Sequence, residues 1–107
     1  MYFELRTYIA APGKLEDLQQ RFRDYTLGIF EKHKMSVVGF WLPDEPDNDK
    51  LVYLLSFPDQ TSATAAWKAF RSDPEWLEAK AKTEENGPLA VQVSSQFLNP
   101  TDYSPLK

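Results

Sequence analysis

Residues 2–10, YFELRTYIA, alternate between two kinds of side chain in the way that a β-strand with two different faces does. The odd positions are mainly apolar, which predicts contact with a hydrophobic core. The even positions carry a carboxylate and a guanidinium between tyrosines. The odd set comprises Phe3, Leu5, Thr7 and Ile9, and the even set comprises Tyr2, Glu4, Arg6 and Tyr8. We expect the odd set to lie under helices and the even set to face the other side of the sheet.

The residues after this strand predict one helix and two more strands. Apolar residues recur at steps of three and four from Leu15 to Ile29, which indicates a helix from residue 15 to about 34. Two runs rich in β-branched and aromatic residues, 35–42 and 51–57, predict strands. The connection between these runs is polar and contains two prolines, so it does not continue a central strand.

The last part of the chain predicts further helical segments and a final strand. Asp59 is a candidate N-cap for a helix over about 60–71, and Asp73, followed by a proline, indicates that a helix starts again there. Residues 89–98 predict a strand, and residues 99–107 form a tail.

The order strand, helix, strand, strand, helix, strand predicts an α+β fold of the ferredoxin-like βαββαβ type, with both helices on one face of an antiparallel sheet. The chain then forms one domain over residues 1–107, with its core in 2–98. Strands 35–42 and 51–57 are apolar on both faces, and such an open face exceeds what a soluble monomer usually exposes. We therefore expect a homodimer in which a second copy covers the open sheet face.

The composition is that of a soluble protein and excludes several classes of function. The chain has 107 residues, no cysteine and a net charge of −4 without a basic stripe, which argues against disulfides, thiolate chemistry and nucleic-acid binding. No apolar run approaches the roughly 20 residues of a membrane span, and the first residues lack the pattern of a signal peptide. We expect a cytoplasmic protein without a membrane partner.

Four short motifs, in this order and at these spacings, resemble the NIPSNAP family. They are YFELRTY at 2–8, PGK at 12–14, VVGFW at 37–41 and DPEW at 73–76. The resemblance covers roughly residues 2–98 and implies a dimeric α+β barrel, in which two ferredoxin-like units pack sheet to sheet with their helices outside. Many members carry His and Trp where this chain has Tyr53 and Leu55. The family implies no settled activity, although related barrel families include cofactor-free monooxygenases, small isomerases and haem-degrading enzymes.

Glu4 and Arg6 are the first candidates for a functional site. They lie two positions apart on one strand face, roughly 6.6 Å along the strand, so their side chains can touch. In a closed barrel interior each group favours the charged form of the other, and the pair would anchor a ligand. The alternative is a purely structural ion pair at an interface.

The other candidates are spread along the chain. His33 is the only histidine, so a zinc site is hard to assemble, and we predict neither a metal nor a cofactor. In the last turn of its helix His33 completes the helix dipole, with a general base or an axial haem ligand as the alternative. Trp41 and Tyr53 are either core residues or ligand contacts. Gln92 belongs to a polar final strand that should pair with the first strand and extend its polar patch.

Two functional hypotheses of different class follow. In the first, the barrel binds a small apolar or aromatic molecule and acts on it without a metal, as a cofactor-free oxygenase or isomerase. Arg6, Tyr8, Trp41, Tyr53 and Gln92 would then bind the ligand, and Glu4 or His33 would move protons. In the alternative, the protein is a non-catalytic homodimeric interaction module. Whether it is an enzyme stays open at this point.

Overall fold

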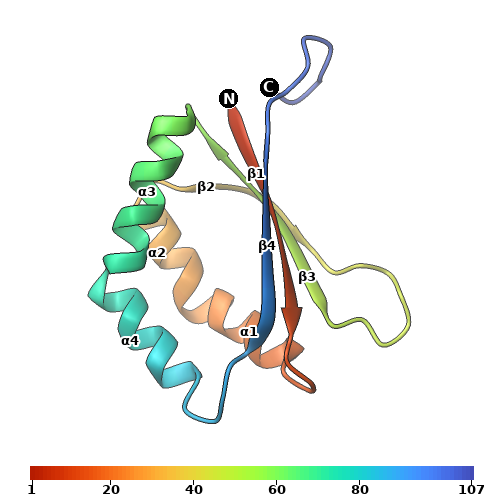
Figure 1. Cartoon of the computed structure of the whole chain (residues 1–107), viewed down its shortest axis with the longest axis vertical. Helices are drawn as coiled ribbons and strands as arrows, with labels where there is room; N and C mark the ends of the chain where they lie inside the picture. Colours follow the sequence, from red (N-terminus) through yellow and green to blue (C-terminus); the bar gives the residue numbers. More distant parts are fainter.

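Four antiparallel strands form one sheet in the computed structural model, which describes all 107 residues (Figure 1). The strands are β1 (Tyr2–Ala10), β2 (Ser36–Trp41), β3 (Lys50–Phe57) and β4 (Ala90–Leu98). Their order across the sheet is β2-β3-β1-β4, so β1 is hydrogen-bonded on both sides. This order confirms the predicted ferredoxin-like fold and the pairing of the first and last strands. No helix is long and apolar enough to cross a membrane.

The helices cover one face of this sheet (Figure 1). The first predicted helix runs without interruption through α1 (Leu15–Arg21), the π-helical segment η1 (Phe22–Thr26) and α2 (Leu27–Lys32). In η1 the hydroxyl of Thr26 donates to the carbonyl oxygen of Arg21, five residues earlier, at 3.4 Å. The extra residue of a π-helical turn was not visible in the apolar spacing.

The predicted caps of the last two helices, α3 (Gln60–Ser72) and α4 (Pro74–Thr83), are confirmed. The Asp59 carboxylate accepts from the backbone N–H of Ser62 at 2.7 Å, and the Asp73 carboxylate accepts from the backbone N–H of Glu75 at 2.9 Å. Both side chains therefore bind backbone donors that a helix leaves free at its start.

The prediction of which face of β1 packs under the helices is wrong. In β3 the side chains of Leu51, Tyr53, Leu55 and Phe57 alternate into the core beneath the helices. The register places Glu4 opposite Leu55 and Arg6 opposite Tyr53, and residues directly opposite share a sheet face. The even set of β1 therefore lies under the helices, because the register with β3 places it on the same face as the buried side chains of that strand.

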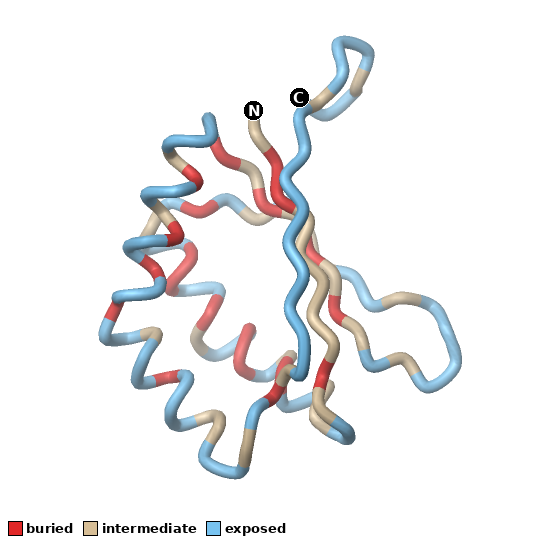
Figure 2. Tube along the Cα trace, in the orientation of Figure 1, coloured by how far each residue is buried: buried red, intermediate tan, exposed pale blue.

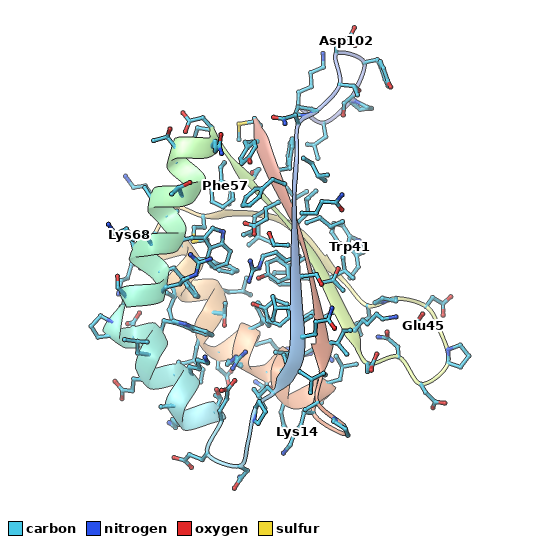
Figure 3. All side chains as sticks on the ribbon, viewed as in Figure 1. Lys14, Trp41, Glu45, Phe57, Lys68 and Asp102 are labelled. Carbon is cyan, nitrogen blue, oxygen red and sulfur yellow. The ribbon has the colours of Figure 1, made fainter.

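The opposite sheet face carries no helix. Trp41 lies on this side, 52% exposed, pointing away from the helices in Figure 3. Leu5 lies beside Leu54 here, and both are partly exposed. Phe3 is an exception, with 5% exposure, and borders a hollow that is also lined by residues of the tail after β4.

Strand β4 is exposed along its whole length except for a half-buried start, as the pale blue segment in Figure 2 shows. It forms one edge of the sheet, next to β1. On the helix side, Arg6 and Tyr8 lie opposite Ser95 and Val93 of β4 and are partly exposed, whereas Glu4 is buried.

Candidate functional site

Six polar and aromatic side chains from four elements meet between the sheet and α3. We name this group the Arg6 cluster. Its members are Glu4, Arg6 and Tyr8 of β1, Tyr53 of β3, Trp67 of α3 and Ser95 of β4.

The Glu4 carboxylate is the most buried charge in the cluster, with 1% of its side chain exposed. It accepts three hydrogen bonds, from Trp67 Nε1 at 2.6 Å, Ser95 Oγ at 2.5 Å and Arg6 Nη1 at 3.0 Å. A buried charge is costly unless it is paired and hydrogen-bonded, and these donors meet that requirement. The strand β4 and the helix α3 are thus both fixed to β1 through one carboxylate.

The Arg6 guanidinium links the acid to the two tyrosines. Its Nε–H donates to Tyr53 Oη at 2.8 Å, and Nη2 donates to Tyr8 Oη at 3.4 Å. The guanidinium carbon lies 4.3 Å from the centre of the Trp67 ring, which is a cation–π contact. Only 12% of the Arg6 side chain is exposed.

The electrostatics keep Arg6 charged and Tyr53 neutral. Burial opposes the charged guanidinium, but the proximity of Tyr53 and Tyr8, together with the hydrogen bonds that Arg6 donates to Tyr8 and Glu4, raises the pKa of Arg6 above its ordinary value. Burial, followed by the proximity of Tyr8, raises the pKa of Tyr53 well above its ordinary value, although Arg6 acts in the opposite direction. At neutral pH Arg6 is therefore a cation and Tyr53 is an uncharged phenol.

His33 belongs to a different group of residues, at the junction of α2 and α4. Its Nε2 lies 2.7 Å from Asp73 Oδ2, and Lys32 Nζ lies 2.7 Å from the same oxygen. Lys32 and then His33 hold the pKa of Asp73 at about 2. His33 is the C-cap residue of α2 and makes no hydrogen bond to the Arg6 cluster.

The structure brings together four of the seven predicted site residues. Glu4, Arg6, Tyr8 and Tyr53 share the Arg6 cluster, and the predicted contact of Glu4 with Arg6 is confirmed. Trp41 lies on the opposite sheet face, and Gln92 also lies there because it is paired with Ile9. Any role of these seven residues in binding or catalysis stays a prediction.

Sequence reasoning missed Trp67 and Ser95 as members of the cluster. The ring of Trp67 is buried in the core, but its indole N–H also needs an acceptor, which Glu4 provides. Ser95 lies opposite Arg6 in the β1–β4 register. A buried acid needs hydrogen-bond donors from neighbouring elements, and this requirement could have pointed to Trp67 and Ser95.

A groove of about 500 Å³ lies elsewhere, between η1, α2 and α4. Tyr25, Gly28, Lys32 and Lys82 are among its lining residues. None of the predicted site residues lines this groove.

Comparison with known proteins identifies the family. Residues 3–105 match the NIPSNAP family model. The chain belongs to the NIPSNAP family. An uncharacterized NIPSNAP domain protein from Burkholderia xenovorans is 24% identical, with 98% of this chain and 99% of that chain covered and a TM-score of 0.84. A NIPSNAP family protein from Agrobacterium tumefaciens is 18% identical, with 99% and 98% covered and a TM-score of 0.86.

A more distant structure shares the fold with this NIPSNAP protein. It is an antibiotic biosynthesis monooxygenase candidate from Nitrosomonas europaea, 12% identical, with 94% of this chain and 98% of that chain covered and a TM-score of 0.61. No curated protein matches the chain. At these identities the solved structures show the fold and do not assign an activity.

Proposed function

We propose that this NIPSNAP protein binds a small apolar or aromatic molecule at the Arg6 cluster, on the helix side of the sheet. The observation that carries the proposal is a charged guanidinium held in a network of large polar side chains beside an uncovered strand. Small-molecule sites typically combine apolar side chains with a small number of precisely placed polar groups. This location differs from the one expected from the sequence, which was the face away from the helices, where Trp41 and Gln92 lie.

Apolar surface continues from the cluster to the outside along β4. Val93 and Phe97 share a strand face with Ser95, opposite Tyr8 and Glu4, and they are 46% and 45% exposed. A ligand ring on these side chains would remove apolar area from water, which is favourable. The ligand's polar end would then reach Arg6.

The proposal extends to a reaction class, that of a cofactor-free oxygenase or isomerase. The predicted proton acceptor Glu4 has both carboxylate oxygens engaged by donors, so it would have to lose a hydrogen bond before it accepted a proton. His33 makes its bond to Asp73 and would serve another site. The geometry therefore supports binding more strongly than turnover.

A homodimeric interaction module in the cytoplasm is the second candidate function. The exposed side chain of Trp41 on the open sheet face, together with the partly exposed Leu5 and Leu54, favours it. Binding at the Arg6 cluster and dimerisation through the open face use opposite sides of the sheet, so both can hold for one molecule.

The three tryptophans provide a direct test of the binding site. Their indole N–H signals report on the Arg6 cluster (Trp67), the open sheet face (Trp41) and the α3–α4 junction (Trp76), where Trp76 packs on Phe70. In a two-dimensional ¹H–¹⁵N NMR titration with 2-naphthol and 2-naphthoate, we expect the Trp67 signal to move and the other two to stay. If only the Trp41 signal moves, the probe binds at the open sheet face.

A further inference from the structure

Some hydrogen-bond donors of the Arg6 cluster have no partner. A guanidinium has five N–H groups. Three of those on Arg6 are directed at Tyr53, Glu4 and Tyr8. The remaining two, one on each terminal nitrogen, have no partner in the structure. The side chain of Arg6 is 12% exposed and lies opposite Ser95 of the exposed strand β4, so we expect a ligand to reach these two groups from beside β4.

The two tyrosines leave one more free hydrogen. Tyr53 Oη accepts from Arg6 Nε and donates to Tyr8 Oη at 3.3 Å. The reverse direction would leave the hydroxyl hydrogen of Tyr53 unpaired in a fully buried residue, which is costly. Tyr8 Oη thus accepts from Tyr53 and from Arg6, and its own hydrogen stays free.

The Glu4 carboxylate, by contrast, is engaged by donors on both oxygens. Glu4 Oε1 accepts from Trp67, and Glu4 Oε2 accepts from Arg6 and from Ser95. The Ser95 hydroxyl donates its hydrogen to Glu4 and keeps its lone pairs, so it is a neutral acceptor. A ligand N–H or O–H would meet this neutral hydroxyl, whereas a ligand oxygen would meet the charged guanidinium of Arg6 and the Tyr8 hydroxyl.

We propose that the ligand of the Arg6 cluster is a small aromatic molecule with an anionic oxygen, either a carboxylate or the conjugate base of a phenol or enol. The inference rests on the proposed function and narrows its ligand class. Charge-assisted hydrogen bonds from Arg6 and the Tyr8 hydroxyl hold the oxygen. The apolar side chains of Val93 and Phe97 on β4 hold the ring.

Matched probes on the unaltered protein test this inference. The set is 2-naphthoate, its neutral amide 2-naphthamide and the cation 2-naphthylmethylammonium, titrated at pH 7.5 by calorimetry. We expect the Kd of naphthoate to be at least tenfold lower than that of the amide, with the weakest binding for the cation. Pentafluorophenol, which is ionised at this pH, represents the phenolate arm, with hexafluorobenzene as its neutral counterpart. The comparison that shows the larger preference for the anion over its neutral counterpart tells whether the ligand oxygen is a carboxylate or a phenolate.

Two tyrosine variants test the assignment to the cluster. Tyr8→Phe removes the hydroxyl that carries the free hydrogen, and with it the acceptor for Tyr53 and Arg6. We expect it to weaken naphthoate binding about three- to tenfold while amide binding changes less than twofold. Tyr2→Phe is the matched control, since it deletes a hydroxyl from the same strand face where the ring stacks on Phe97, and it should leave both affinities unchanged. Thermal unfolding of both variants checks that they fold.

The outcomes separate this inference from the proposed function. If the amide or the cation binds as tightly as naphthoate, the preference for an anionic oxygen is wrong, and aromatic binding still stands. If no ring-containing probe moves the Trp67 signal, both proposals are wrong. The comparison of probes on the unaltered protein decides the first point even if Tyr8→Phe does not fold.

Discussion

Glu4 and Arg6 stabilise the fold only as a pair, because each is buried. Removing Arg6 alone leaves a carboxylate at 1% exposure with two neutral donors. Breaking a buried pair in this way typically costs about 3–5 kcal/mol. We expect Arg6→Met to lower the free energy of unfolding by that amount. Glu4→Gln combined with Arg6→Met should recover much of the loss, since the amide oxygen still accepts from Trp67. Urea unfolding midpoints measure both.

Arg71 provides the control for that experiment. Its guanidinium lies 5.2 Å from the centre of the same Trp67 ring, but Arg71 is exposed. We expect Arg71→Met to cost about 1 kcal/mol or less, in line with exposed cation–π contacts. A loss of only a few tenths of a kcal/mol for Arg6→Met would show that the Glu4–Arg6 pair is open to solvent.

Asp73 should make stability depend on pH in the acid range. Its pKa is about 2 in the folded protein, below the value of about 3.9 for an unperturbed aspartate. The unfolded chain therefore takes up a proton first as pH falls, so the stabilisation by Asp73 is present above about pH 4 and is lost towards pH 2. Asp73→Asn should flatten the stability curve in this range.

The measurement is a series of urea unfolding curves between pH 7 and pH 2. Asp102→Asn, in the exposed tail, is the control and should keep the slope of the unaltered protein. Parallel curves for the unaltered protein and Asp73→Asn would show that the Lys32 and His33 contacts do not form in solution.

At the residue scale, the spacing of residues predicted which side chains touch, but it did not predict which sheet face they occupy. Two positions of separation on one strand were enough to predict that Glu4 meets Arg6. The face was predicted from β1 alone, whereas it is set by the register with β3, which places Tyr53 and Leu55 beside the charged pair. Register depends on contacts between distant residues, and a single sequence does not show these directly.

Two glycines in different elements should respond oppositely to alanine. A Cβ on Gly28 in α2 meets no atom within 4 Å, so Gly28→Ala should stabilise the protein by about 0.5–1 kcal/mol through helix propensity. A Cβ on Gly39 in β2 would lie 2.8 Å from the Trp41 ring, so Gly39→Ala must displace that ring and should bring no gain. Thermal unfolding and tryptophan fluorescence report both effects. Destabilisation by Gly28→Ala would contradict the open environment at this position.

At the element scale, sequence patterns placed the strands and helix starts within one or two residues. The caps at Asp59 and Asp73 and the strand-forming runs are local signals, and local signals are what one sequence contains. The segment η1 escaped prediction because the apolar side chains around it keep helical spacing. One extra backbone residue in a turn changes the hydrogen-bond partners without changing which residues are apolar.

For the whole molecule, we predict a homodimer that buries at least ~1,200 Å² through the open sheet face. Leu54→Glu places a charge on that face next to Leu5, and it should shift the protein to a monomer. Leu77→Glu is the control, because Leu77 is 52% exposed on α4 in the helical layer and should not affect the dimer. Light scattering at micromolar concentration measures both, and a monomeric unaltered protein would contradict the prediction.

The fold as a whole was predictable because element order and alternating patterns restrict the possible topologies to few. The candidate site was only partly predictable. Its β1 residues were found, but Trp67 and Ser95 join them from positions more than sixty residues away in the sequence.

The strand order β2-β3-β1-β4 has a consequence for biosynthesis. β1 leaves the ribosome before β3 and β4, yet it pairs with both of them. The hydrogen bond between Glu4 and Ser95 joins residues 91 positions apart, so the nascent chain carries the acid without this donor until β4 has been translated. Long-range pairing of this kind slows folding and leaves an unpaired strand edge exposed in the meantime. The protein therefore depends on β4 to complete the environment of Glu4.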